Sequence, residues 1–367
     1  MAKRTENNWN PLQPYNELPL LPPAVDIETP AILKATIQAR SALSQLDRLA
    51  NKLPNPGVLV RTLPLLEARC SSEIENIVTT DDELFRNGNS LDDALDPALR
   101  EAGRYAEALL EGYWSLPKLP VCTRLAQQLC SRIKGHPMPI RKLPGTYLAK
   151  GKNVTYTPPV GESVLRKMLT NWETYLHDNR GPDPLIRMAV AHYQFEAIHP
   201  FTDGNGRTGR ILNSLYLVEA NLLEQPILYL SRYILTHRTE YYRLLNAVTR
   251  SHAWEPWILY ILNGVVEVAT WTAQKVEEIH RLVESTHIQI KTKCPVIPSE
   301  EMIRIIFEQP YCRIKNLVDS SIAKRETASI YLAQLVKVGI LKEVKVGRDK
   351  LFLNHRLIKL LVGPRVP

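Results

Sequence analysis

The chain has 367 residues, enough for two or three domains of ordinary size, and its 44% hydrophobic and 23% charged residues exclude wholesale disorder and an integral membrane protein. Its five cysteines form no CxxC pair, which argues against a disulfide framework or a zinc cluster, and because no export signal or membrane span is evident we expect a protein of the reducing cytoplasm. The net charge of +8 belongs to the chain from Lys291 onward, where 15 Lys and Arg stand against 7 Asp and Glu, so this part carries either a nucleic-acid surface or an ordinary solvated face.

The N-terminal part of the chain divides into an extended segment and a helical region. Six prolines disfavour a helix over residues 1–30, because proline removes a backbone donor and fixes φ, so we predict a Pro-rich extended strap. Apolar residues near helical spacing then predict an N-terminal helical region over residues 31–115. One amphipathic helix is expected to begin at Ala31 and a second after Pro64.

The next predicted unit, residues 116–290, is also mostly helical. Helical patterning recurs over residues 94–116, 121–133, 164–175, 184–198, 210–223 and 257–283. One exception is the segment 145–159, in which two β-prone runs flank a Gly-containing turn and end at two prolines. This pattern predicts a β-hairpin.

The C-terminal unit, residues 295–367, has a different order of elements. Three helices are predicted over residues 300–308, 314–318 and 324–338, followed by strands over 340–346 and 350–354. This order predicts a winged helix, so the fold class as a whole is mainly α, a helical core with a hairpin plus a C-terminal winged-helix domain. Lys324 and Arg325 begin the third helix, where a helix-turn-helix protein would meet DNA, but the same topology also serves protein docking or dimerisation.

The strongest chemical signal is the segment 199–210, which reads His-Pro-Phe-Thr-Asp-Gly-Asn-Gly-Arg-Thr-Gly-Arg. Pro200 ends the preceding helix, so His199 lies at a helix exit. The run Gly204, Asn205, Gly206 is free to adopt positive φ and predicts a nest of backbone N–H groups for an anion, directly before a helix that starts near Arg207.

Charged residues complete this predicted anion site. Arg207 and Arg210 are three residues apart and share a face of the helix's first turn, where the helix N-terminus also favours phosphate. Asp203 adds an oxygen ligand suited to a Mg²⁺ ion that bridges carboxylate and phosphate. The cluster therefore predicts a metal–nucleotide site. The same glycines spell GxGxxG, but they follow a helix instead of a strand, which argues against a dinucleotide fold.

Segment 199–210 matches every defined position of the Fic family signature HPFxDGNGRxxR, and the chain resembles that family over roughly residues 30–290. The resemblance implies a protein adenylyltransferase, which transfers AMP from ATP to a Tyr, Thr or Ser hydroxyl of a target protein and releases pyrophosphate. His199 would be the general base, in keeping with an imidazole pKa near ~6.5, and Asp203 would hold Mg²⁺. The nucleotide would be bound at Gly204, Asn205, Gly206, Arg207 and Arg210.

Upstream, residues 71–76 read Ser-Ser-Glu-Ile-Glu-Asn and match the family's inhibitory pattern. Ser71 and Glu75 are i, i+4 neighbours on one helix face, so we expect Glu75 to reach Arg210 and occupy the guanidinium that the γ-phosphate needs. Without its partner motif the same spacing would indicate only a solvated helix face. In some relatives this glutamate also supports removal of the modification, so de-AMPylation stays an alternative.

The partners follow from the same reading. A target segment is expected to add as a strand to the hairpin at 145–159, whose Tyr147 and Tyr156 either clamp the target or, as we favour, stabilise the hairpin. Gly206 favours AMP transfer, because the phosphorylating toxins of the family carry Lys there. Base contacts near Asn213 or the tyrosines at 241 and 242 are weaker suggestions. The alternative function is a nucleotide-sensing DNA-binding regulator, which needs no general base, and a homodimer stays open.

Overall fold

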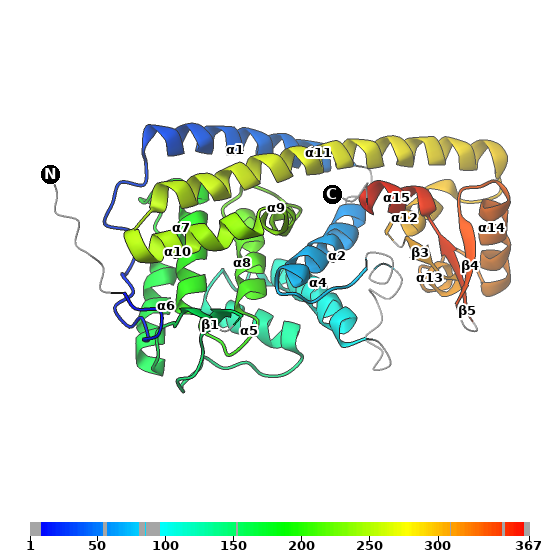
Figure 1. Cartoon of the computed structure of the whole chain (residues 1–367). Helices are drawn as coiled ribbons and strands as arrows, with labels where there is room; N and C mark the ends of the chain where they lie inside the picture. Colours follow the sequence, from blue (N-terminus) through cyan, green and yellow to red (C-terminus); the bar gives the residue numbers. More distant parts are fainter. Residues whose placement is uncertain are drawn as a thin grey trace.

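The protein is described from a computed structural model of the whole chain, in which residues 9–53, 57–80, 85, 96–151, 153–308, 310–346 and 349–362 are described. Figure 1 shows an elongated, mainly helical molecule with a helical core at one end and a small unit containing a three-stranded sheet at the other. Helix α11 (Trp254–Lys293) spans both. Among the described residues, no helix has the length and apolar character needed to cross a membrane.

The N-terminal helix α1 (Pro30–Ala50) lies beside α11 along one side of the molecule (Figure 1). Thr29 caps its first turn by accepting a hydrogen bond from the Ile32 N–H, and Pro30 follows at the position where proline is best tolerated. The described part of the predicted strap, residues 9–29, forms neither helix nor strand and includes short turns, and the Tyr15 N–H donates to the Thr157 carbonyl. The strap therefore lies against the core just beyond the predicted hairpin.

The second helix, α2 (Gly57–Ile74), begins earlier than the sequence suggested. The predicted start after Pro64 was wrong, because Pro64 lies inside the helix. An interior proline costs about 3 kcal/mol, but the buried side chains of Val58, Leu59 and Leu63 each contribute about 1.5–3 kcal/mol on burial, which offsets that cost. Helix α2 packs against α4 (Pro97–Ser115) within the N-terminal region, and the contacts of α2 with α9 (Leu230–Thr236) and of α4 with α5 (Thr123–Lys134) join this region to the core.

The core surrounds helix α7, whose bounds Pro184–Ile198 agree with the predicted range. This helix is buried on nearly all sides, and the helices that precede and follow it in the core are α5 (Thr123–Lys134), α6 (Glu162–Leu176), α8 (Asn205–Glu219), α9 (Leu230–Thr236) and α10 (Arg238–Ser251). Helices α9 and α10 were missed from the sequence. In α10 the buried residues Tyr241, Leu244 and Val248 have helical spacing, but polar residues surround them.

The predicted hairpin is confirmed as the antiparallel pair β1 (Leu148–Lys150) and β2 (Asn153–Tyr156). Tyr156 is buried, and its hydroxyl donates to the Ala197 carbonyl at 2.8 Å, so this residue stabilises the hairpin against α7. Tyr147, in contrast, is 59% exposed. The hairpin thus lies next to the C-terminal end of α7.

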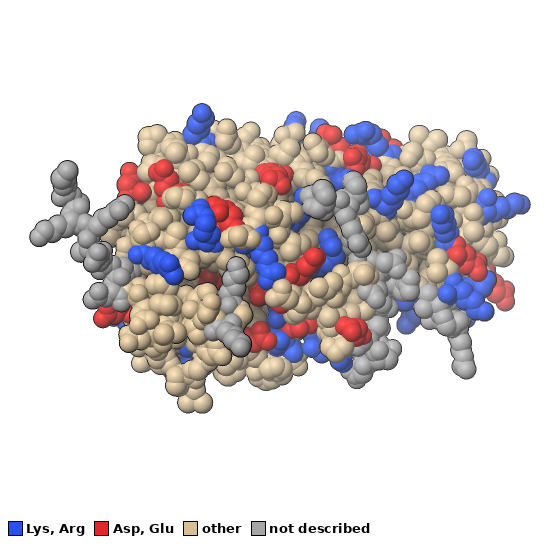
Figure 2. Space-filling model, in the orientation of Figure 1, with Lys and Arg blue, Asp and Glu red and all other residues tan. Residues whose placement is uncertain are grey.

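The C-terminal unit has helices α12 (Ser299–Glu308), α13 (Ile314–Asp319) and α14 (Arg325–Lys337), and strands β3 (Tyr311–Cys312), β4 (Lys342–Val346) and β5 (Asp349–Leu353). The antiparallel order β3-β5-β4 is compatible with the predicted winged helix. A further helix that the sequence did not suggest, α15 (His355–Val362), packs on α11. On the face shown in Figure 2, this unit carries several Lys and Arg side chains together with a few Asp and Glu.

Candidate active site

His199 lies at the end of α7, as the sequence predicts. Its N–H still donates to the Phe195 carbonyl at 3.0 Å, but its own backbone turns into the left-handed region with φ 51° and ψ 59°. Pro200 follows and cannot continue the helix. The chain therefore leaves α7 at His199, and the imidazole is carried by a sharply turned backbone at the start of segment 199–210.

The imidazole of His199 has a defined proton arrangement. Nδ1 lies 3.4 Å from the Glu196 carbonyl oxygen, which can only accept, so Nδ1 carries the proton and Nε2 is left as an acceptor. Burial and, to a smaller extent, the positive charge of Arg141 together lower the pKa of His199 to about 4. The ring is therefore neutral at physiological pH, as a general base must be.

The loop between α7 and α8 is closed by a side chain of the motif. Asn205 accepts from the Phe201 N–H and donates to the Phe201 carbonyl, both at 2.8 Å, and the Phe201 ring is fully buried. The Asn205 side chain is therefore committed to the loop. A ligand could meet this residue only through its backbone N–H.

The predicted nest was wrong in one respect. Gly204 does have positive φ (79°), but Asn205 and Gly206 are already the first residues of α8, so the helix starts two residues before Arg207. The anion site is thus a helix N-terminus, where the first N–H groups have no partner within the helix. The space beside Gly206 is narrow, since a Cβ there would clash with the Glu75 carboxylate and lie 3.0 Å from Arg210 NH1, so a larger residue would force the Glu75 side chain to shift.

Arg210 is 2% exposed and is held by residues of the segment 71–76. Its Nε donates to the Ser71 hydroxyl at 2.8 Å, and one terminal nitrogen donates to the Ser71 carbonyl and to Glu75 Oε1, both at 2.9 Å. Burial opposes the charged form, but Glu75 and other acidic groups outweigh it and raise the pKa of Arg210. The pairing of Glu75 with Arg210 that the sequence predicts is therefore present.

The geometry that brings Glu75 to Arg210 differs from the predicted helix face. Helix α2 ends at Ile74, and Glu75 lies in the turn that follows, with its N–H donating to the Ser72 carbonyl at 3.0 Å. Asn76 then adopts the left-handed conformation (φ 63°), which asparagine tolerates better than most residues and which commonly ends a helix. The left-handed backbone at position 76 thus explains why an asparagine, or equally a glycine, fits directly after Glu75.

Arg207 and Arg210 contact different groups, so among the described residues their two guanidinium groups have no partner in common. Arg207 is buried, with NH1 2.7 Å from Glu101 Oε1 and NH2 3.7 Å from Asp203 Oδ1. Lys134 joins the same cluster, its Nζ lying 2.7 Å from Glu101 and 2.6 Å from Asp203. Two carboxylates and two cations therefore alternate beside the loop. Glu101 and Lys134 lie on α4 and α5, and the sequence analysis missed both.

Asp203 has the properties of a single protein ligand for a metal that arrives with a nucleotide. Its side chain is 58% exposed, and although burial raises the pKa of its carboxyl, the hydrogen bond and charge of Lys134 outweigh this and lower the pKa. Among the described residues, no group of three or more His, Cys, Asp or Glu could hold a metal by itself. Since Mg²⁺ is commonly held by one or two carboxylates plus phosphate oxygens, Asp203 fits such an ion.

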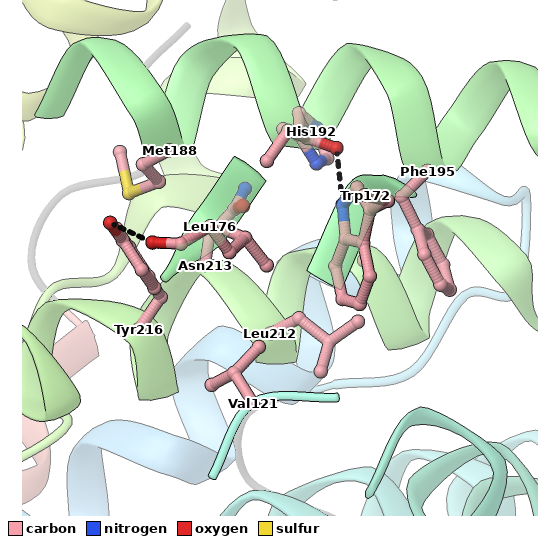
Figure 3. A pocket seen from close by; sticks show the side chains of 11 residues that line it. Val121, Trp172, Leu176, Met188, His192, Phe195, Leu212, Asn213 and Tyr216 are labelled. Atoms are coloured by element: carbon pink, nitrogen blue, oxygen red, sulfur yellow. Dashed lines mark hydrogen bonds between the residues drawn. The ribbon is translucent and has the colours of Figure 1, made fainter. Parts of the chain in front are cut away.

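A separate cavity lies between α6, α7 and α8 (Figure 3). It concerns the suggestion that the nucleotide base contacts Asn213 or the tyrosines at 241 and 242. His192 and Asn213 both line it, and its volume of about 10 Å³ admits no more than a water molecule. The cavity at Asn213 therefore has no room for a nucleotide base in this structure. Tyr241 is also excluded, because it is buried and its hydroxyl is paired with His192 Nε2 at 2.9 Å, whereas Tyr242 is 43% exposed.

Comparison with known proteins identifies the fold and the family. Residues 33–114 match the Fic/DOC family N-terminal domain, residues 118–217 match the Fic/DOC family, and residues 282–357 match the C-terminal domain described as that of protein adenylyltransferase SoFic-like proteins. A crystal structure of a Fic family protein from Desulfovibrio desulfuricans has the same fold, with a TM-score of 0.54 over 91% of this chain and 98% of that one at 19% identity. The chain belongs to the Fic/DOC family.

Relatives with assigned names share a common description. Protein adenylyltransferase Fic of Drosophila willistoni is 25% identical over 70% of this chain and 49% of its own length. A probable protein adenylyltransferase of Aquifex aeolicus is 28% identical over 46% and 52%, and protein adenylyltransferase fic-1 of Caenorhabditis briggsae is 28% identical over 44% and 33%. The chain thus spans about half the length of these relatives, or less.

Proposed function

We propose that the protein is an adenylyltransferase that transfers AMP from ATP to a hydroxyl side chain of a target protein. The observation that carries the proposal is a neutral imidazole whose acceptor nitrogen, His199 Nε2, has no hydrogen-bond partner among the described residues and lies one loop away from the N-terminus of α8, where an anion is expected to bind. A site that only sensed nucleotide would need the second feature but not the first. The names of the relatives support the same activity.

In the proposed reaction His199 Nε2 accepts the proton of the target hydroxyl as the oxygen attacks the α-phosphorus of ATP. A phosphorus–oxygen bond forms to the target, and the bond between the α-phosphorus and the bridging oxygen of the β-phosphate breaks, so that pyrophosphate leaves with the electron pair. The N–H groups at the start of α8 and the guanidinium of Arg207 stabilise the negative charge that develops. The proton on His199 then passes to solvent.

Magnesium is expected to accompany the nucleotide. Asp203 would hold the ion, which when bound neutralises charge on the phosphate oxygens. Lys134 lies 2.6 Å from Asp203 and 2.7 Å from Glu101, so it already balances both carboxylates. The Lys134 ammonium group therefore keeps the Asp203 carboxylate ionised and in place.

Target docking is proposed on the hairpin of residues 145–159. In the part of the chain that the structure describes, its two strands pair only with each other, so an extended segment can add to an edge through main-chain hydrogen bonds and bring a Tyr, Thr or Ser hydroxyl toward His199. The Tyr156 hydroxyl, bonded to Ala197, fixes the distance between that edge and the end of α7. Docking of this kind selects a target segment by its extended backbone more than by its amino-acid sequence.

The pairing of Glu75 with Arg210 is proposed to inhibit the enzyme. Arg210 donates through its Nε and one terminal nitrogen to Ser71 and Glu75, so these donors cannot also bind the γ-phosphate of ATP. The Glu75 carboxylate also lies beside Gly206, at the N-terminal turn where phosphate would enter, and places negative charge there. Both effects disfavour a productive pose of ATP.

The decisive experiment incubates the purified protein and its Glu75→Gly variant with Mg²⁺ and ATP labelled at the α-phosphate, followed by mass spectrometry. Adenylyl groups on hydroxyl side chains, lost on His199→Ala while ATP still binds, are expected. Labelling that persists without His199 would contradict the proposed base, and ATP binding without any labelling would favour the nucleotide-sensing regulator.

A further inference from the structure

Arg141 lies in the loop between α5 and β1 and is 4% exposed. Its side chain donates to three backbone carbonyls: Nε to His199 at 2.7 Å, and one terminal nitrogen to Ile198 at 3.1 Å and to Pro159. Its backbone N–H donates to the Pro200 carbonyl at 2.9 Å. One residue thus binds three successive carbonyls around His199 and a fourth at the end of the hairpin segment.

These carbonyls need an external donor. The last carbonyls of a helix have no intrahelical partner, and the usual closing donors come from the residues just beyond the end. Here His199 turns into the left-handed conformation and Pro200 has no N–H, so the chain itself offers little. A guanidinium fits the position, because it has several donors in a fixed plane and its charge is favourable at a helix C-terminus.

The groups that the buried Arg141 guanidinium contacts are also unusual for a buried cation. No carboxylate forms an ion pair with Arg141 in the part of the chain that the structure describes, and every hydrogen bond described for its side chain goes to a backbone carbonyl. Burial lowers the pKa of Arg141, because a buried cation lacks water. A neutral residue here would avoid the free-energy cost of burying a cation. The charge and the planar guanidinium of Arg141 therefore point to a role in holding the loop.

We infer that Arg141 is a positioning residue, which fixes His199 relative to the hairpin by binding the backbone of both. His199 and Pro159 are joined through a single side chain, so the base and the proposed target-docking strands move together. This inference rests on the proposed function for the identity of the reaction. The physical claim, that Arg141 sets the backbone and environment of His199, stands on geometry.

The kinetic test compares Arg141→Lys and Arg141→Gln in a Glu75→Gly background, with Arg281→Gln as the matched control. Arg281 is an exposed arginine of α11 that pairs with Glu277 of the same helix. For Arg141→Gln we expect kcat to fall roughly 100-fold, the loss typical of an ~1 Å misplacement, while the Kd for ATP changes less than about twofold. Arg141→Lys should keep part of the activity and the control all of it.

A second measurement does not need turnover. The titration of the His199 ring, followed by NMR of the imidazole nitrogens, reports the charges that act on it, which are those of Arg141, Glu75 and Asp203. Removing the cation in Arg141→Gln should raise the pKa of His199, whereas Arg141→Lys keeps the charge and should hold it low. Thermal unfolding of each variant separates these effects from loss of the fold.

Two results would overturn the inference: an Arg141→Gln protein that folds and keeps full kcat, or one whose His199 titrates as in the parent. A loss of kcat that merely follows the unfolded fraction in both Arg141 variants would also overturn it. If the parent protein transfers no AMP, the proposed function fails, but the titration still decides whether Arg141 controls His199. The two failures are therefore distinguishable.

Discussion

Glu75 and Arg210 are 135 positions apart in the chain, yet their carboxylate and guanidinium lie 2.9 Å apart where α2 meets α8. Ser71 binds the same guanidinium twice, through its hydroxyl and its carbonyl. Arg210 is almost completely buried, so its orientation is fixed by these partners. A change at Glu75 therefore alters which groups the guanidinium can bind without removing the guanidinium.

Glu75→Gly is expected to raise the initial rate of AMP transfer roughly tenfold or more, since each tenfold corresponds to about 1.4 kcal/mol of barrier and a single ion pair in this half-buried position is of that order. Arg210 would keep both bonds to Ser71 and gain a free donor for phosphate. Incorporation of α-labelled phosphate into protein, measured at saturating Mg²⁺, checks the rate.

The matched control for that experiment is Glu73→Gly. Glu73 lies on the last turn of the same helix and pairs only weakly with Arg69, at 3.6 Å. The substitution removes one carboxylate and introduces one glycine, as at Glu75, but leaves the Arg210 pair intact. Equal rate increases in the two variants would show that loosening α2, and not freeing Arg210, activates the enzyme.

His199→Ala is expected to reduce AMP transfer by roughly 10²–10⁴-fold, the usual contribution of a positioned general base, with little change in ATP affinity. The ring is neutral because burial lowers its pKa to about 4, so in the parent the rate should fall only as pH decreases toward 4. Single-turnover rates between pH 4.5 and 8, with ATP binding measured by calorimetry, check both statements. An acid limb near pH 6.5 would contradict the buried setting of His199.

The segments 199–210 and 71–76 could be predicted to meet because each is a local pattern with a physical meaning. Pro200 forces the helix exit, Gly204 permits the left-handed turn, and Ser71 and Glu75 are four residues apart, although Glu75 lies just beyond the end of α2. The bounds of α7 follow equally from Asp183 as cap and Pro184 as first residue. These features depend on neighbours in sequence, which a reader of the chain can see.

Arg141, Lys134 and Glu101 could not be found in this way. The chain holds 46 Lys and Arg, and nothing in local spacing shows which of them lies near a loop 58 residues further along. The start of α2 was missed for a related reason, since burial of its apolar face outweighs the local signal of Pro64. Contacts made by tertiary packing are the part of this site that required coordinates.

Glu196 provides a prediction about stability. Burial raises the pKa of its carboxyl from 4.5 to about 7, with Arg210 opposing and Glu75 reinforcing the shift. The folded state thus binds more protons than the unfolded state between pH 4.5 and 7, so the contribution of Glu196 to stability is present below pH 4.5 and lost as pH rises through 7. Glu196→Gln cannot titrate and should gain stability relative to the parent over this window.

The measurement for Glu196 is urea unfolding of both proteins at pH 5 and pH 8. Glu67, whose pKa burial also raises to about 7, is present in both proteins, so its effect cancels in the difference. The difference between Glu196→Gln and the parent should be larger at pH 8. A difference that is the same at both pH values would show that Glu196 does not carry the shifted proton.

Gly206 offers a test of the contact between the two motifs that needs no substrate. A Cβ at this position would clash with the Glu75 carboxylate, so Gly206→Ala should destabilise the parent, even though alanine is the better helix former by about 1 kcal/mol. In a Glu75→Gly background the clash is gone and the helix preference is unchanged. The cost of the alanine should then fall by about 1 kcal/mol or more in a double-mutant cycle measured by urea unfolding. Equal costs in the two backgrounds would mean that Glu75 does not rest beside Gly206 in solution, and the proposed inhibition would lose its structural basis.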